Sequence, residues 1–340
     1  MWKYAFWNNK GGTGKTSLAF QAITAYAVSH RASRILVVDV CPQANLSELF
    51  LGGLTNRGSA KLLQRQGATP RASIGGYFQM RLPSPYTMPP GIDFDAFVTR
   101  PADYNRAIPG NIDLICGDPL LELQANAINT LANNQIPGTE TWIAVIDWLD
   151  DLLKLAEDYY DIVFFDCNPS FSIYTQIAIA NADRLILPVM ADDSSRRAVQ
   201  NALSLVYGLM LPSPIYTTYA FSTKLRAARR ELPKVHLIAK NRLTQYMGPA
   251  SAYAAVLKSV DRDIRQLITS HPDLFTFSST EEGTVDIRDF QTTGVVAFAR
   301  GVPFCELRAG KQDIGGHRVE VKEDYRQLCL EAIEEIVLTL

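Results

Sequence analysis

A glycine-rich segment near the start of the chain separates an expected strand from an expected helix. The apolar run Tyr4–Trp7 precedes the segment Asn8–Gly14. From Thr16 onward, apolar residues recur at the three- and four-residue spacing of a helix with one buried face. The β-branched run Ile35–Val38 follows and ends at Asp39. A strand, a helix and a second strand in this order predict a βαβ unit with parallel strands and a right-handed crossover.

Further apolar runs continue this alternation and predict an α/β fold with a doubly wound, mostly parallel sheet flanked by helices. The expected strands are Ile112–Ile115, Ile162–Phe165, Leu185–Val189, Val235–Ala239 and Val295–Phe298. The length alone suggests two domains, but large α/β sheets often absorb insertions, so we expect residues 1–340 to form a single domain. Residues 52–110 are rich in glycine and proline and are expected to form a loop-rich insertion within that domain.

Composition excludes several classes of protein. The chain is 47% hydrophobic and 20% charged with a net charge of -2, values that exclude a disordered chain. No run of 18 or more apolar residues is present, so no membrane-spanning helix is expected. The five scattered cysteines predict no disulfide framework and favour the reducing cytoplasm.

The glycine-rich segment carries the groups needed to bind a nucleoside triphosphate. Glycines allow backbone N–H groups to turn toward an anion, and the following helix adds partial positive charge at its N-terminus. Lys15 can reach the β- and γ-phosphates, and the Thr16 hydroxyl can ligate Mg²⁺. We therefore predict that this segment binds the phosphates of a nucleoside triphosphate. The predicted contact residues are Lys10, Gly11, Gly12, Thr13, Gly14, Lys15, Thr16 and Ser17.

This segment resembles the deviant Walker A box of the ParA/MinD family of ATPases. The strict motif has a glycine at the position of Asn9, whereas here Lys10 adds a cation at the start of the loop. In that family the early lysine reaches the nucleotide held by the other subunit. The resemblance therefore implies a homodimer that encloses two ATP molecules, with Lys10 acting across the interface.

The resemblance extends to two further segments. Asp39–Asn45 is similar to the family's switch I, and Tyr160–Ser170 is similar to its Walker B strand and switch II. ParA-like partition proteins match best, through Pro42–Asn45. The resemblance implies that Thr16 ligates Mg²⁺ directly. It also implies that Asp166 holds a metal-bound water, that Asp39 belongs to the magnesium shell or to switch I, and that Lys10, Lys15 and Asp39 are catalytic. Asn241 follows an expected strand, where related P-loop proteins often contact adenine.

One position departs from the family pattern. The second aspartate of switch I is replaced by Cys41, and a thiol is mostly uncharged near neutral pH. Slow or rerouted hydrolysis is the expected consequence. Two alternatives stay open at this point: a nucleotide-gated binding module with little or no hydrolysis, and a small-molecule ATP-dependent enzyme on the same scaffold.

A basic stretch suggests a polyanionic partner. It comprises Lys224, Arg226, Arg229, Arg230, Lys234, Lys240 and Arg242. The candidate DNA-binding residues among them are Lys224, Arg226, Arg229, Arg230, Lys234 and Arg242. The resemblance implies nonspecific DNA binding by such residues, which would weaken with salt; a solvated helix face is the alternative. The resemblance also implies a ParB-like or cargo adaptor protein, and a role in positioning a plasmid, chromosome or other cargo in the cytoplasm, at the nucleoid if DNA is bound. The acidic polar face of the expected C-terminal helix argues against a membrane partner.

Overall fold

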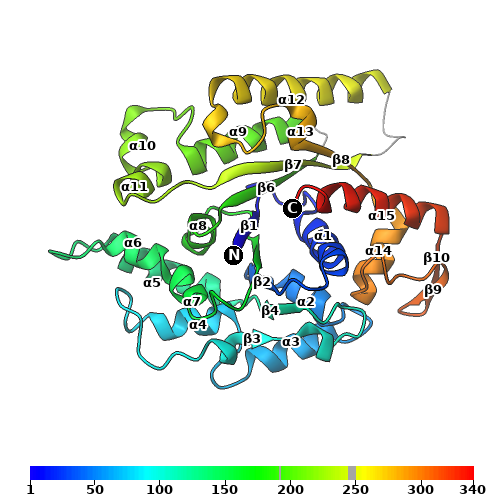
Figure 1. Cartoon of the computed structure of the whole chain (residues 1–340), viewed down its shortest axis with the longest axis horizontal. Coiled ribbons are helices and arrows are strands. Elements are labelled where there is room, and N and C mark those ends of the chain that lie inside the picture. The colour runs from blue at the N-terminus through cyan, green and yellow to red at the C-terminus, as the bar shows by residue number, and fades with distance from the viewer. Residues whose placement is uncertain (191–192, 244–249) are drawn as a thin grey trace.

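Eight strands build one central sheet in a computed structural model that describes residues 1–190, 193–243 and 250–340. The strands are β1 (Trp2–Phe6), β2 (Ile35–Val40), β3 (Val98–Thr99), β4 (Ile112–Ile115), β5 (Ile162–Cys167), β6 (Arg184–Met190), β7 (Lys234–Leu243) and β8 (Thr284–Arg288). Their order across the sheet is β3-β4-β2-β5-β1-β6-β7-β8 (Figure 1). All neighbouring pairs are parallel except β3 with β4. The predicted doubly wound, mostly parallel sheet is confirmed.

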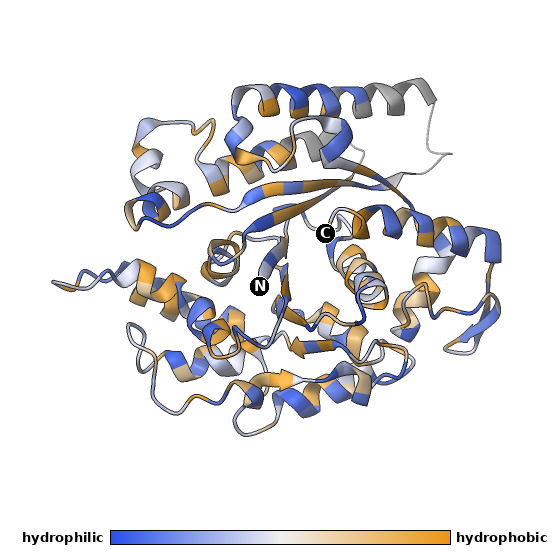
Figure 2. Cartoon of the chain, viewed as in Figure 1, coloured by the Kyte–Doolittle hydropathy of each residue, from blue (hydrophilic) through white to orange (hydrophobic). Residues whose placement is uncertain are grey.

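Helices cover both faces of this sheet (Figure 1). One face carries α1 (Lys15–Ser29), α2 (Asn45–Leu51), α14 (Gln291–Arg300) and α15 (Glu323–Val337). The other face carries α4 (Ile74–Arg81), α5 (Leu120–Asn133), α6 (Thr141–Ile146), α7 (Trp148–Lys154), α8 (Ile173–Ala180), α9 (Asp193–Tyr207), α11 (Phe221–Ala227) and α12 (Ala250–Ser270). Strands covered on both faces have no solvated side, which explains why β2 and β5 are continuous apolar runs. Figure 2 shows this apolar character along the central strands.

The smaller elements lie around these layers. They are α3 (Gly58–Gln66), α10 (Pro214–Tyr219), α13 (Thr280–Gly283), the antiparallel hairpin of β9 (Gly310–Ile314) and β10 (His317–Val321), and 3₁₀ turns at Phe94–Phe97, Pro101–Asp103 and Pro272–Leu274. Within the described ranges, no helix has the length and apolarity needed to cross a bilayer.

Residues 52–110, expected to be rich in loops, hold two helices and a strand of the central sheet. Helix α4 buries Tyr77 and Phe78 in the same hydrophobic core as the main sheet, and Phe97 of the following turn joins them. Strand β3 then pairs with β4 and extends the sheet by one edge strand. This segment therefore packs against the sheet as part of its hydrophobic layer.

The expected strand Val295–Phe298 is wrong, because these residues lie within α14. Thr293, Val296 and Ala297 are buried at helical spacing, and Gly301 ends the helix with a φ of 60°. A short apolar run does not distinguish a strand from a buried helix by periodicity alone. The edge strand beside β7, at the end of the sheet opposite β3, is β8, in which the buried Val285 and Ile287 flank an exposed Asp286.

Candidate nucleotide site

The glycine-rich loop leaves the carboxyl end of β1 and turns into α1 with open space beside it. Gly12 and Gly14 each have a φ of 75°, a left-handed conformation that glycine adopts without steric strain. A Cβ added to Gly11 or Gly12 would meet nothing within 4 Å. Asn8 anchors the base of the loop, because its Nδ2 donates to the Pro188 carbonyl at 2.6 Å. The loop is thus held at its base and accessible along its glycines.

Lys15 and Thr16 both bind one buried carboxylate at the start of α1. The Lys15 ammonium forms an ion pair with Asp166 Oδ1, and Thr16 Oγ1 donates to Asp166 Oδ2 at 2.9 Å. Burial works against the charge of Lys15, but Asp166 more than offsets it, so the pKa of Lys15 is raised. The sequence prediction placed these three residues at one site, and the structure brings them together.

Asp39 and Asp166 lie side by side although 126 residues separate them. Strand β5 inserts between β2 and β1, and the register pairs Asp39 with Asp166 on neighbouring parallel strands. Side chains paired in register point to the same face of a sheet. Asp39 is fully buried, and burial, followed by the charge of Asp166, raises its pKa to about 7.

The donor set at this point fits a small hard cation. Mg²⁺ prefers oxygen ligands, keeps several waters and is usually bound by one or two carboxylates together with substrate phosphates. Asp39, Asp166 and the Thr16 hydroxyl supply such oxygens beside the phosphate loop. In the part of the chain that the structure describes, no group of three or more His, Cys, Asp or Glu side chains forms a metal site. A Mg²⁺ ion held by these oxygens would take its remaining ligands from water and from the phosphates of a nucleotide.

Cys41 is buried two residues beyond Asp39. Its side chain is 7% exposed, and its Sγ donates to Gln43 Oε1 at 3.4 Å. Burial, followed by the negative charges of Asp39 and Asp166, raises the pKa of the thiol to about 12. The thiol therefore stays protonated at neutral pH and does not act as a proton acceptor.

A small cavity lies where Asn241 meets the phosphate loop. Asn241 Nδ2 donates to the Thr13 carbonyl at 2.7 Å. The cavity, of about 170 Å³, is lined by Gly14, Ser17, Asn241, Asp289, Phe290, Gln291, Gly294, Val295 and Phe298. Sequence reasoning found Asn241 and Ser17 but missed the contribution of α14, because that run was assigned to a strand. The signal that was available is the helical spacing of its buried residues.

Lys10 lies half-buried at the rim of the loop. Its backbone N–H donates to Asn8 Oδ1 at 3.0 Å, which orders the chain at this position. The sequence prediction that Lys10 acts on the nucleotide of a second copy concerns an assembly, and it stays a prediction.

The basic stretch divides into separate environments. Lys224 lies over the Trp142 ring at 5.3 Å, and Arg230 pairs with Asp147, whereas Arg226, Arg229 and Lys234 are exposed. These five cations lie in α11 and in the chain that leads into the start of β7.

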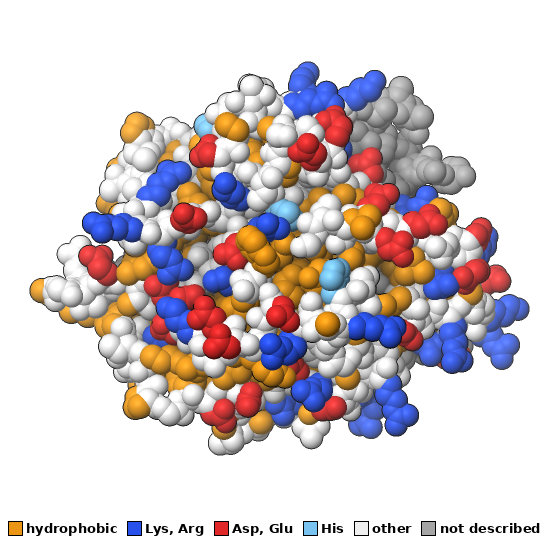
Figure 3. All heavy atoms as spheres, in the orientation of Figure 1, with side chains coloured by type: hydrophobic (Ala, Val, Ile, Leu, Met, Phe, Trp, Pro, Cys, Tyr) orange, Lys and Arg blue, Asp and Glu red, His pale blue; other side chains and the backbone are white. Residues whose placement is uncertain are grey.

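The end of β7 lies far from that group of cations. Lys240, near the carboxyl end of the strand, is buried and paired with Asp261 and Asp286. The side chain of Arg242 lies outside the described residues. Its backbone follows Lys234 by eight positions of one strand, or roughly 26 Å. On the face shown in Figure 3, positive and negative side chains are interspersed.

Several known proteins resemble this chain in sequence. A family model described as "AAA domain" matches residues 1–209. A putative replication protein A of Rhizobium rhizogenes is 26% identical over 186 residues, which cover 54% of this chain and 38% of that protein. The chromosome-partitioning ATPase Soj of Thermus thermophilus is 26% identical over 202 residues, which cover 59% of this chain and 60% of that protein. The chain thus spans only part of the length of the curated relatives it matches.

Solved structures extend the likeness over the whole chain. McdA of Cyanothece without nucleotide aligns with a TM-score of 0.60 and 16% identity over 99% of both chains. A McdA variant in complex with ATP aligns with a TM-score of 0.59 at 16% identity, over 99% of this chain and 96% of that one. At this level of identity, the likeness shows a shared fold.

Proposed function

Because this chain belongs to the ParA/MinD family of P-loop ATPases, we propose that it is an ATP-switched protein that dimerises around ATP and positions cargo on DNA. The observation that carries the proposal is the arrangement of Lys15, Thr16, Asp39 and Asp166 beside an open glycine loop. It supplies a cation for phosphates and hard oxygens for Mg²⁺ at one point.

Each group has a role in this proposal. The loop N–H groups and Lys15 bind the phosphates, while Thr16, Asp166 and Asp39 would hold Mg²⁺. When bound, Mg²⁺ neutralises the charge that develops on the transferred phosphoryl group. Asn241 and the start of α14 enclose the nucleoside, because they line the cavity next to Gly14 and Ser17. Lys10 closes over the nucleotide of the second copy and makes the dimer depend on ATP.

Hydrolysis is expected to be slow. A buried Cys41 with a pKa of about 12 neither accepts a proton nor supplies negative charge. Asp39 is the nearest carboxylate along the chain, and its oxygens already accept hydrogen bonds from the Cys41 N–H, the Ser47 N–H and the Ser47 hydroxyl. The same observation favours a second candidate function, a nucleotide-gated binding module with little turnover.

DNA is the proposed matrix, contacted through the exposed cations Arg226, Arg229 and Lys234. Contacts with phosphates release counterions, so the logarithm of the binding constant should fall linearly with the logarithm of the salt concentration. Dimerisation would double the number of cations engaged and so strengthen retention. A ParB-like or cargo adaptor is the proposed partner, and the cytoplasm and nucleoid are the proposed location.

The test measures mass in solution and DNA retention with ATP, with ADP and without nucleotide. A doubling of mass and retention only with ATP is the expected result. The Lys10→Ala variant should bind ATP yet stay monomeric. The Arg229→Ala/Lys234→Ala double variant should dimerise yet lose DNA. Lys311→Ala/Arg318→Ala, which removes two exposed cations from the β9–β10 hairpin, is the matched control for charge. Mass and retention that do not respond to nucleotide would contradict the proposal.

A further inference from the structure

The segment from Gln66 to Ser73 holds the turn that follows β4. Gln66 Nε2 donates to the Gly117 carbonyl at 2.9 Å. The Arg71 guanidinium forms a two-point ion pair with Asp118, with Nη2 at 3.0 Å from Oδ1, and the Ser73 hydroxyl donates to the same carboxylate. Asp118 is fully buried. Residues of the 52–110 segment thus compensate the buried charge that fixes this turn.

The other side of the same turn holds Ser47, at the start of α2. The Gly117 N–H donates to Ser47 Oγ at 2.9 Å. Ser47 Oγ in turn donates to Asp39 Oδ2 at 2.7 Å, and the Ser47 N–H donates to the same oxygen at 2.9 Å. With the Gly117 N–H directed at its oxygen, the Ser47 hydroxyl has its proton directed toward Asp39. Such chains polarise and strengthen each other when buried.

The turn also lies in close contact with the loop that leads to Ser47. A Cβ on Gly117 would lie 2.7 Å from the Cys41 carbonyl oxygen and 2.8 Å from Ala44 Cβ. A Cβ on Gly75 would lie 2.7 Å from Asp118 Cβ. Close-packed contacts of this kind transmit displacement, because little free volume absorbs it. A shift of the turn would therefore move the switch I loop.

We infer that the 66–76 segment positions the Asp39 carboxylate for ATP hydrolysis through Gly117, Asp118 and Ser47. Ser47 is a positioning residue, since it acts on the reaction only through Asp39. The inference rests on the proposed ATPase function, and it assigns a role to residues of the 52–110 segment that the function itself does not require. A carboxylate displaced by about 1 Å can slow a reaction by about 100-fold, so small shifts suffice.

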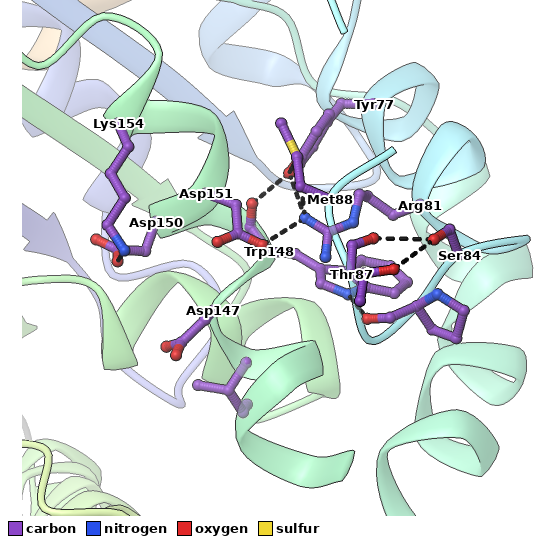
Figure 4. Close-up of polar contacts among 12 residues, drawn as sticks. Tyr77, Arg81, Ser84, Thr87, Met88, Asp147, Trp148, Asp150, Asp151 and Lys154 are labelled. Carbon is purple, nitrogen blue, oxygen red and sulfur yellow. Dashed lines mark hydrogen bonds and ion pairs between the residues drawn. The ribbon is translucent and has the colours of Figure 1, made fainter. Parts of the chain in front are cut away.

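A second anchor of the 52–110 segment, outside residues 66–76, provides a matched control. Arg81 is 1% exposed and pairs with Asp151 at 2.6 Å (Figure 4). It also bonds the Tyr77 hydroxyl at 3.1 Å and lies 5.4 Å from the centre of the Trp148 ring. These partners belong to α4 and α7 and not to the turn after β4. An Arg81→Met variant therefore loosens the segment without removing a link to Asp39.

The first readout requires no nucleotide. Amide hydrogen exchange reports the N–H groups of Cys41 and Ser47, both of which donate to Asp39. Each exchange rate is first divided by the acceleration of core amides that exchange through global unfolding. On this scale, we expect Asp118→Asn to speed exchange of both amides at least tenfold, and Arg81→Met to leave them within twofold of the native chain. Equal acceleration in the two variants, or none in Asp118→Asn, would overturn the inference, because the effect would then be general loosening or absent.

The second readout separates binding from turnover. Ser47→Ala and Asp118→Asn should each lower the single-turnover rate of ATP hydrolysis at least tenfold, with the Kd for ATP within twofold. The double variant should lose little more than either single variant, because both act on one chain of contacts. A native rate in Asp118→Asn would refute the inference. If the native chain itself hydrolyses no ATP, the proposed function fails, while the exchange measurement still decides the positioning.

Discussion

Replacing Cys41 with aspartate should speed ATP hydrolysis and destabilise the nucleotide-free protein in a pH-dependent way. Burial and the nearby carboxylates raise the pKa of the Cys41 thiol from 9.0 to about 12. That difference corresponds to about 4 kcal/mol against a negative charge at this position. An aspartate at position 41 must either take up a proton when the protein folds or remain ionised, as a third buried negative charge beside Asp39 and Asp166.

The sign of the pH dependence follows from this. A carboxyl whose pKa is raised on folding is tolerated below its unfolded pKa and becomes destabilising as the pH rises. The gap in unfolding free energy between the native chain and Cys41→Asp should therefore be small near pH 4. It should widen to at most about 4 kcal/mol toward pH 8. Urea unfolding from pH 4 to 8 measures the gap, with Cys41→Ser as the control for the loss of the thiol.

The same variant carries the functional expectation. With Mg²⁺ and ATP present, the added carboxylate should be compensated, and single-turnover hydrolysis should rise at least tenfold. A gap in stability that does not change with pH would refute the electrostatic reasoning. An unchanged rate would refute the account of Cys41 as the cause of slow hydrolysis.

Three further predictions concern single sites. Arg81→Ala should lower the free energy of unfolding by about 3 kcal/mol in urea titrations, because it breaks a buried ion pair whose carboxylate, Asp151, stays 28% exposed and partly hydrated; a loss under 1 kcal/mol would contradict this. Lys15→Met should reduce ATP affinity at least 100-fold in calorimetric titrations, since the phosphates lose their buried cation; affinity within threefold of native would exclude that role. Burial lowers the pKa of His236, so stability should fall as the pH drops below about 6.5, and His236→Gln should remove this part of the acid dependence in thermal unfolding from pH 7 to 5.

Local sequence determined the phosphate loop almost completely. The turn after β1 needs glycines at positive φ, and Gly12 and Gly14 adopt it. The next helix places Lys15 and Thr16 directly after that turn. These requirements lie within a few consecutive residues, so a motif is enough to predict them. The buried strands were predictable for a similar reason, because strands of a covered parallel sheet are continuous apolar runs.

The sequence alone did not decide whether a short apolar run forms a helix or a strand. It also did not decide whether a charged side chain is exposed or is buried in an ion pair. The run in α14 could pack as a helix or as a strand, and the sheet already had its edge in β8. Lys240 belongs to the same basic stretch as Lys234, yet it is buried between Asp261 and Asp286. The helix at α14 and the burial of Lys240 both depend on residues that are distant in the sequence.

Only the tertiary structure decided which distant residues meet. The amino-acid sequence was enough to predict the glycine-rich loop and the mostly parallel sheet. It also showed that Cys41 stands where the family has an aspartate. The order of the strands places Asp39 next to Asp166. The turn at Gly117 connects Ser47 to residues 66–76, a segment that the sequence assigned to an insertion. Pairing of strands far apart in the chain is governed by burial and loop closure over the whole molecule, which no local pattern of residues encodes.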